Sequence, residues 1–361
     1  MRGEVDPQVA MFSYVSTERR VPTDHPLRSI KAYADAALRA ISAELDDLYG
    51  KTGRPSIAPE RLLKGQLLIA LYTVRSDRAF CEQLDYNLLF RWFLDMSLDD
   101  AGLDQSNFSR LRERLVQTDI ARNFFDQVLR LAKAQRLLSS EHFTVDSTLI
   151  ESWASLKSLK KDGRPPKGGG DGTGMVDFKG ERRTNQTHQS STDPEAKLMR
   201  RGNGQPAKLC FGGHALMENR SGLCADLQIH DSRASEPKVA QQLLARLRRK
   251  RIHARTLGAD KGYHTKAFVE HLRAHHIRPH IARIEGRKTP GLDVRTTRHE
   301  SYRTSQRTRK RVEEIFGWLK TVGGMRKSRV IGITRTQMQA YLAASAYNLL
   351  RMARLAPIST S

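Results

Sequence analysis

Residues 141–150, EHFTVDSTLI, set the architecture of the chain. The apolar residues around Asp146 predict a buried strand that ends in polar residues. A second apolar run, ARTLGADKGY at residues 254–263, is broken after Asp260 by a Lys-Gly pair. In open α/β sheets, functional sites assemble at the carboxyl ends of strands. We therefore expect these two strand-borne carboxylates to meet at one edge of a sheet.

A third acid lies in a segment with helical character. Residues 308–320 read TRKRVEEIFGWLK and carry Glu313. Three convergent carboxylates repel one another unless a cation lies between them, and hard oxygen ligands suit Mg²⁺ or Mn²⁺. Two such ions can stabilise both sides of an in-line phosphoryl displacement. Asp146, Asp260 and Glu313 are therefore the predicted catalytic residues and metal ligands.

The charge of the chain points to a polyanionic partner. The 361 residues carry 62 Lys+Arg against 39 Asp+Glu, a net charge of +23 and a pI near 10.3. Such a balance predicts nucleic acid as the partner, with a basic but non-binding protein as the alternative. The length is sufficient for two or three domains with their own cores.

Cysteine usage and hydropathy indicate the compartment. Three cysteines lack metal-ligand spacing and form no disulfide framework, which fits a reducing environment. No signal peptide is expected from the N-terminal residues. No uncharged apolar stretch reaches the roughly 18 residues that span a bilayer. We expect a cytoplasmic protein without a membrane partner.

Residues 1–138 predict an all-α N-terminal domain. A strong apolar stripe follows Pro59, a residue that suits the first turn of a helix, with Ser56 as a candidate cap. Shorter helices are predicted for residues 77–84, 87–96 and 107–116, and a long one for 121–138. Helices separated by short polar turns are typical of a helix-turn-helix DNA-binding domain.

One of these helices carries a group of arginines. Residues 104–115, DQSNFSRLRERL, offer Asp104 or Ser106 as a cap and present Arg110, Arg112 and Arg114. Such a helix could enter a major groove and bind DNA. A solvated face in a packing or dimerisation domain is an equal alternative.

Residues 139–361 predict an α/β catalytic domain. Strands over 142–150, 208–219 and 224–231 would form an antiparallel meander, followed by parallel strands over 255–260 and 278–281. Helices are expected at 236–250, 266–276, 308–322 and 335–355, the last amphipathic and packed on the catalytic core. Residues 157–193 are rich in Gly, Pro, Ser, Thr and charge, which predicts a mobile basic insertion, either a plain linker or a segment ordered by a polyanion.

Five motifs in this order resemble one protein family. They are GRPSIAPERLLKGQLL (53–68), FTVDSTLI (143–150), GGHALMENRSG (212–222), LGADKGY (257–263) and RKRVEEIFGWLK (309–320). Together they resemble bacterial insertion-sequence transposases, more narrowly the insertion-sequence-five group. The resemblance implies a ribonuclease-H-like catalytic core with an Asp–Asp–Glu triad.

The resemblance carries over residue by residue. Asp146 and Asp260 match the two aspartates, and Glu313 and Glu314 compete for the glutamate. The family places an Arg four residues before the glutamate and a Lys seven after it. Arg309 and Lys320 satisfy this spacing for Glu313, and the offsets lie on one helix face.

The family tyrosine is absent from its expected position. Gln306 stands three residues before Arg309, and Tyr302 lies off the spacing. A role for that tyrosine is therefore in doubt.

Further site residues are expected near the triad. His214 lies in a predicted strand close to the acids and is either an active-site neighbour or a core histidine. The basic stretch 295–311 leads into the Glu313 helix, so Arg309, Lys320, Arg307 and Arg311 are expected to contact DNA phosphates, with helix-face ion pairing as the alternative for Arg309 and Lys320.

The resemblance implies a DNA transposase that cleaves strands at the ends of its insertion sequence and transfers them to target DNA. It implies two Mg²⁺ or Mn²⁺ ions in each active site. The partners would be double-stranded DNA, as inverted-repeat ends and target, and further copies of the chain in a dimer or larger synaptic complex in the bacterial nucleoid. Two alternatives are an inactive or domesticated homologue that regulates through sequence-specific DNA binding, and another metal-dependent nuclease of the same fold.

Overall fold

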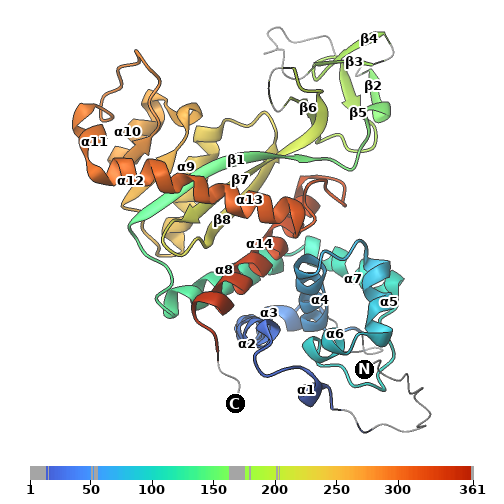
Figure 1. Cartoon of the computed structure of the whole chain (residues 1–361). Coiled ribbons are helices and arrows are strands. Elements are labelled where there is room, and N and C mark those ends of the chain that lie inside the picture. Colours follow the sequence, from blue (N-terminus) through green and yellow to red (C-terminus); the bar gives the residue numbers. More distant parts are fainter. Residues whose placement is uncertain are drawn as a thin grey trace, which may run out of the picture.

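The first part of the chain is built from helices that precede the sheet (Figure 1). The computed structural model describes residues 14, 16–49, 52, 56–161, 175–178, 180–200, 202 and 204–358. The helices of this first part are α1 (Thr17–Arg20), α2 (Pro26–Arg39), α3 (Ser42–Asp46), α4 (Pro59–Leu71), α5 (Asp77–Tyr86), α6 (Leu88–Phe93), α7 (Gln105–Val116) and α8 (Ile120–Ala134).

Local capping explains where several of these helices begin. Asp104 caps α7, since its carboxylate accepts the Asn107 N–H at 2.8 Å. The N-cap of α4 is Ala58 and makes no side-chain hydrogen bond, so the predicted cap Ser56 is wrong. Pro59 at the first position of α4 needs no such partner for its own nitrogen, because proline has no N–H.

The rest of the described chain is organised around one six-stranded mixed sheet. Its strand order is β10-β9-β1-β7-β6, with β8 also paired to β7. The central strand β1 runs antiparallel to β7 and parallel to β9. The strands are β1 (His142–Glu151), β6 (Lys197–Met199), β7 (Lys208–Glu218), β8 (Cys224–Asp231), β9 (Thr256–Ala259) and β10 (Arg278–Ile281).

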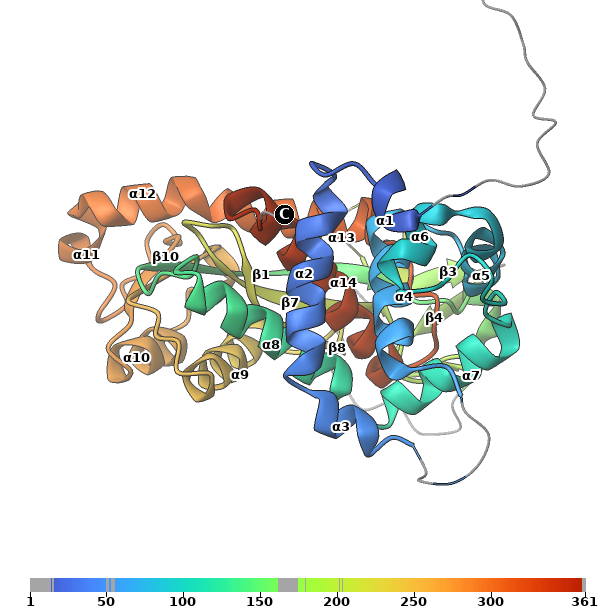
Figure 2. The same cartoon turned by 90° about the horizontal axis from the view of Figure 1, so that it is seen from below.

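Helices cover both faces of the sheet, as the mixed α/β prediction requires (Figure 2). One face packs on α9 (Glu236–Arg249) and α10 (Lys266–Ala274) and has a core of its own, with Val145 and Leu257 among its members. The opposite face carries α13 (Val312–Thr321) and α14 (Ile333–Leu355). Alternate strand residues face opposite sides, so β1 contributes Val145 to the first core and Ile150 to the second.

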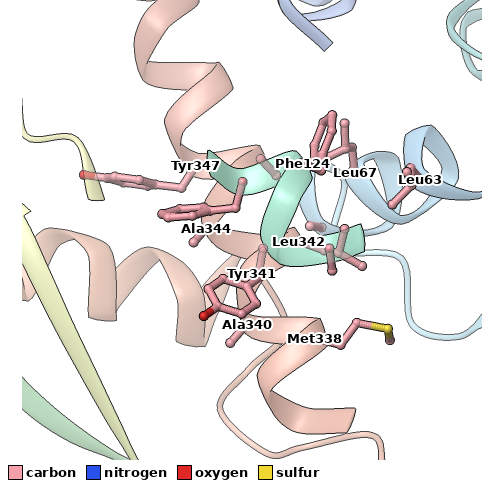
Figure 3. Packing of buried hydrophobic residues seen from close by; sticks show 14 of the residues in the cluster. Leu63, Leu67, Phe124, Met338, Ala340, Tyr341, Leu342, Ala344 and Tyr347 are labelled. Carbon is pink, nitrogen blue, oxygen red and sulfur yellow. The ribbon is translucent and has the colours of Figure 1, made fainter. Parts of the chain in front are cut away.

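The long helix α14 joins the two parts of the chain. It packs against α2, α4 and α8 of the helical part and against β8 of the sheet. Figure 3 shows Leu342 of this helix on the side of Leu67 and Phe124, while Tyr341 points to another side. Because α14 is buried on nearly every side, the predicted amphipathic helix is wrong, and a helix apolar all round is the pattern of a core element.

Residue 138 falls in the connection between α8 and β1. The apolar core does not divide there, since a single cluster of buried residues runs from α2 through α8 and α14 to the sheet.

Some elements were missed by sequence reasoning. Part of the segment 157–193 forms small sheets, although no strands were predicted there, and residues 162–174 and 179 lie outside the described chain. Its anchor is the buried Asp193, which accepts a hydrogen bond from the Ser152 hydroxyl at 2.8 Å. The small strands are β2 (Leu159–Lys161), β3 (Met175–Phe178), β4 (Glu181–Thr184) and β5 (His188–Ser190).

The basic stretch before α13 is also more regular than expected. It forms α11 (Val294–Arg298), α12 (Glu300–Thr308) and the 3₁₀ turn η3 (Arg309–Arg311). Tyr302 explains the position of α12, because its hydroxyl donates to the Ile281 carbonyl of β10 at 3.0 Å. Over the described part of the chain, no helix has the length and apolar character needed to cross a membrane.

Candidate active site

Two of the predicted acids lie on neighbouring strands, with Asp146 in the middle of β1 and Asp260 directly after the end of β9, so the expected position of Asp146 at a strand end is wrong. The parallel ladder between β1 and β9 ends with Thr144 opposite Gly258. Continuing this register by two residues places Asp146 beside Asp260, on the same face of the sheet. The strand pairing itself therefore brings together residues that are far apart in the sequence.

The surroundings of Asp146 disfavour its negative charge. The pKa of Asp146 is raised to about 6, chiefly by burial and also by the neighbouring carboxylates Asp260 and Glu236, while the Ser147 N–H and Arg309 act in the opposite direction. The Ser147 N–H donates to Asp146 Oδ1 at 2.8 Å. The protein alone thus leaves part of the negative charge of this cluster uncompensated.

Glu236 is a third acid in this cluster that sequence reasoning missed. It opens α9 on the other side of the sheet and accepts a hydrogen bond from the Ser147 hydroxyl. Its Oε2 and Asp260 Oδ1 each lie 3.1 Å from the point where a Cβ at Gly262 would stand. A side chain at Gly262 would therefore meet both carboxylates. The signal that could have found Glu236 is its place in the first turn of a helix directly after the β7–β8 hairpin.

Tyr263 completes the enclosed side of the site. Its ring is fully buried, and its hydroxyl has no hydrogen-bond partner among the described residues. Burial raises its pKa well above the ordinary value, and Glu236, Asp146 and Asp260 add to this effect. The hydroxyl therefore keeps its proton and lies within the electrostatic influence of the three carboxylates. The motif DKGY contains this residue, but spacing alone did not single it out.

Two cations predicted from the sequence approach the acids from the α13 side. Arg309 acts electrostatically on Asp146, and its buried Nε has no hydrogen-bond partner. Lys320 donates to the Thr148 hydroxyl at 2.5 Å. Thr148 lies two residues after Asp146 and shares its face of the sheet. Arg309 of η3 and Lys320 of α13 thus lie at the two ends of the side of these elements that packs on β1, which we call the flank.

Glu313 lies on this flank but is not drawn into the acidic cluster. It is exposed and makes no hydrogen bond or ion pair with any described residue. Glu314 faces elsewhere, since Arg351 of α14 pairs with it at 3.2 Å. The structure therefore separates the two candidates: Glu314 has a packing role, and Glu313 is the unengaged carboxylate between Arg309 and Lys320.

The three arginines of α7 that were predicted to contact DNA do not share one environment. Arg110 and Arg114 are exposed on α7, whereas Arg112 pairs with Asp77 of α5. The prediction that one face of α7 bears all three arginines is therefore wrong, because residues two apart in a helix point to nearly opposite sides.

The two predicted contacts beside Arg309 are partly engaged within the protein. Arg307 is exposed, with Glu300 at 3.5 Å. Arg311 donates to the Asn219 and Arg220 carbonyls and so holds η3 against the end of β7.

His214 and Gln306 have local structural roles. His214 is buried beside Ser147 in the register, and burial together with His230 lowers its pKa to about 4. Gln306 donates to the His280 carbonyl of β10, so the residue at the family's tyrosine position ties α12 to the sheet. Neither side chain contacts the acids in the structure.

The carboxylates are ligands of the type that a hard divalent cation prefers, but in the structure they do not form a closed metal site. Asp146, Asp260 and Glu236 supply carboxylate oxygens around an uncompensated negative charge, with the orphaned Tyr263 hydroxyl beside them. In the described residues no group of three or more His, Cys, Asp and Glu side chains is close enough together to hold a metal by itself.

Comparison with known proteins agrees with this geometry. Residues 15–114 match the family described as Transposase domain (DUF772), and residues 176–349 match the family described as Transposase DDE domain. The chain is 26% identical over 248 residues to the transposase for insertion sequence element IS1106 of Neisseria meningitidis serogroup B. The aligned residues make up 68% of this chain and 77% of that protein. The chain belongs to the DDE transposases.

The similarity to solved structures is weaker. A piggyBac transposase synaptic complex with hairpin DNA is 11% identical, with a TM-score of 0.41 and coverage of 93% of this chain and 77% of that chain. The Mos1 transposase paired-end complex is 15% identical, with a TM-score of 0.20 and coverage of 67% and 64% respectively.

The matched DDE region holds part of the acidic cluster. Asp260, Glu236 and Glu313 of this transposase lie within residues 176–349. Asp146 lies between the two matched regions, and strand pairing brings it to Asp260.

Proposed function

We propose that this DDE transposase cleaves DNA strands at the ends of its insertion sequence and joins them to target DNA, with Asp146, Asp260 and Glu313 as its catalytic acids. The observation that carries the proposal is the register of β1 and β9, which sets Asp146 beside Asp260. The order of the strands, with β1 between an antiparallel and a parallel neighbour, supports a ribonuclease-H-like core.

The acids would hold divalent metal ions, which DDE transposases use in general. Asp146 and Asp260 would be shared ligands, and Glu313 would complete the set from α13. Two bound Mg²⁺ or Mn²⁺ ions would supply an activated oxygen nucleophile and stabilisation of the leaving oxygen. The raised pKa of Asp146 supports a cation at this position, because a cation favours the ionised carboxylate that the protein alone disfavours.

The chain's own residues would position the DNA backbone and the acids. Arg309 and Lys320 lie on the flank that faces β1, so they would hold phosphates on either side of the cut. The Ser147 hydroxyl orients Glu236, and Tyr263 keeps its hydroxyl proton within the cluster. No serine or cysteine nucleophile is required by this arrangement.

Double-stranded DNA is the partner that the charge supports. A net charge of +23 favours phosphate binding over most of the surface. Transposition joins two DNA ends, so a dimer or larger synaptic complex is part of the proposal.

The test is cleavage of labelled duplexes that carry the ends of the element, in Mg²⁺ or Mn²⁺, by the wild type and by Glu313→Gln. We expect cutting at the element boundary by the wild type and a loss of about a thousandfold in the variant, because an ionised ligand is replaced by an amide. Glu314→Gln is the matched control and should cut at nearly the wild-type rate.

Tight, end-specific binding without cutting by the wild type would instead favour a regulator. Equal cutting by Glu313→Gln and the wild type would remove Glu313 from the site.

A further inference from the structure

A cavity with charged and apolar lining residues lies at the seam between the helical part and the sheet, away from the acids. Its volume is about 370 Å³, within the range of roughly 300–1,000 Å³ of small-ligand pockets. Helices α4, α5 and α7 line one side, and Trp153, Arg329 and the start of α14 line the other. Trp153 follows Asp146 by seven residues, which is roughly 20 Å along an extended strand.

The charge of this seam cavity suits an anion. Its lining holds four arginines and one acid, Asp77. That acid is already engaged, since Arg112 pairs with it and the Ser109 hydroxyl donates to it at 2.9 Å. Arg75 and Arg78 are exposed and have no hydrogen bond or ion pair among the described residues.

The fourth arginine, Arg329, lies deeper and has no acidic side chain paired with it in the described part of the chain. Arg329 donates from its Nη1 to the Val74 carbonyl at 2.6 Å and is half-buried. Burial lowers its pKa, and only Asp77 acts in the opposite direction. A phosphate in the cavity would supply the missing counter-charge.

The mouth of the seam cavity presents an aromatic surface. The Trp153 side chain is 55% exposed, and Lys327 Nζ lies 5.3 Å from its ring centroid. An exposed indole next to unpaired arginines is the combination that stacks an unpaired base and holds its backbone. In an intact duplex every base face is already stacked, so such a surface is of use only to an unpaired base.

Unsatisfied amides lie in the same lining. Gln66 Nε2, Gln339 Oε1 and Arg112 Nε are buried and have no hydrogen-bond partner among the described residues. Buried polar groups without a partner are unfavourable, so a ligand that forms hydrogen bonds with them would be stabilised. The edge of a nucleobase offers both a donor and an acceptor.

We propose that the seam cavity binds one unpaired nucleotide of the DNA substrate, with its phosphate on Arg75, Arg78 and Arg329, its base against Trp153, and the base edge on Gln66 and Gln339. The proposal rests on the proposed function for its choice of DNA. The cavity joins the two family-matched regions, since α4, α5 and α7 belong to the first and Arg329 to the second. Binding there would fix the DNA to both parts of the chain.

The test compares two short duplexes, one fully paired and one with a single unpaired 2-aminopurine at its centre. Affinity is measured by fluorescence anisotropy in EDTA at fixed salt, so that no cleavage occurs. We expect the wild type to prefer the duplex with the unpaired base by about tenfold and to quench its 2-aminopurine by stacking. Trp153→Ala should lose both effects and bind the paired duplex as the wild type does.

Matched variants separate the base from the phosphate. Arg78→Gln should weaken binding of both duplexes, because it removes a phosphate contact. Tyr86→Ala removes another exposed aromatic side chain, outside the cavity, and should keep the preference and the quenching. Thermal unfolding of each variant shows whether it is folded.

Several results would overturn the proposal. Equal binding of the two duplexes by the wild type without quenching would remove the nucleotide site, while cleavage of element ends would still support the proposed function. A stronger preference for the same unpaired base in RNA than in DNA would exclude DNA as the occupant. Failure to bind any duplex would overturn both proposals.

Discussion

The two sides of the candidate active site are held in place by different means. Asp146 lies on β1 and Asp260 directly follows β9, so the backbone hydrogen bonds between these two strands keep the acids near one another. Glu313 lies on α13, which touches β1 through its flank and anchors itself by Ile315, Phe316 and Leu319 in the core below. The strand-borne acids therefore form a cluster without any ligand, whereas Glu313 stays exposed.

The difference shows how a sheet and a helix respond to repulsion between neighbouring carboxylates. A sheet can force like charges together because many backbone hydrogen bonds oppose their repulsion. A helix flank offers no such constraint, so an acid on it takes the solvated position. The comparison predicts that cleavage requires the acids of both sides, and that the cations on the helix side adjust its rate.

The largest expected effect is on the strand side. Asp146→Asn and Asp260→Asn should each lower the rate of metal-dependent cleavage by about a thousandfold or more, since each removes an ionised ligand. The measurement is single-turnover cleavage of an element-end duplex, with binding of the same duplex as the check on folding. Asp99→Asn, in an exposed turn, is the control. Cleavage by either site variant at a near wild-type rate would show that the paired strands do not form the active site.

A variant of Glu236 tests which helix supplies the third acid, α9 or α13. Glu236→Gln should lower the cleavage rate by about tenfold and raise the metal concentration needed for half the maximal rate, because the cluster loses one negative charge. Glu285→Gln, in an exposed loop, should leave both unchanged. If Glu236→Gln is as severe as Asp146→Asn while Glu313→Gln is mild, the third acid belongs to α9 and the roles of the two helices are reversed.

The contact between α13 and β1 should have a smaller effect. Lys320→Met and Thr148→Val each remove the 2.5 Å hydrogen bond and should slow cleavage by about two- to fivefold. The double variant should be no slower than Lys320→Met alone if the two side chains act as one unit. Strictly multiplicative losses would show that Lys320 acts on DNA independently of Thr148.

The smallest expected effect is on stability. The folded-state pKa of Asp146, about 6, is above its ordinary value in an unfolded chain, so its ionisation destabilises the metal-free protein at neutral pH. That cost is fully present above the folded pKa and disappears as pH falls through it toward 4. In EDTA at pH 7, Asp146→Asn should therefore raise the melting temperature by a few degrees.

The pH dependence supplies the control for this effect. The difference in melting temperature between Asp146→Asn and the wild type should shrink between pH 7 and pH 5, since the wild-type carboxyl becomes neutral. A difference that is constant with pH would show that the charge of Asp146 is not the cause.

Sequence patterns predicted the strand-borne part of the site well. Apolar runs ending in Asp146 and Asp260 correspond to β1 and to the end of β9, because a buried strand has a short, continuous apolar signature. The hairpin β7–β8 was likewise predicted from its turn, where Gly222 has a φ of +71°.

Other features depend on tertiary contacts that a local pattern does not contain. Glu236 joins the cluster only through Ser147 and Gly262, which lie in distant segments. Helix α12 has few apolar residues and depends on Tyr302 and Gln306 reaching β10. The seam cavity combines residues from both ends of the chain and has no motif of its own.

The position of α14 has a consequence for inheritance. This helix comes after the sheet in the sequence, yet its Leu342 packs toward α4 and α8, which come before the sheet (Figure 3). A gene interrupted after residue 138 would yield a helical fragment whose apolar faces have lost their cover. We therefore expect copies of the gene truncated in this way to yield no stably folded helical fragment.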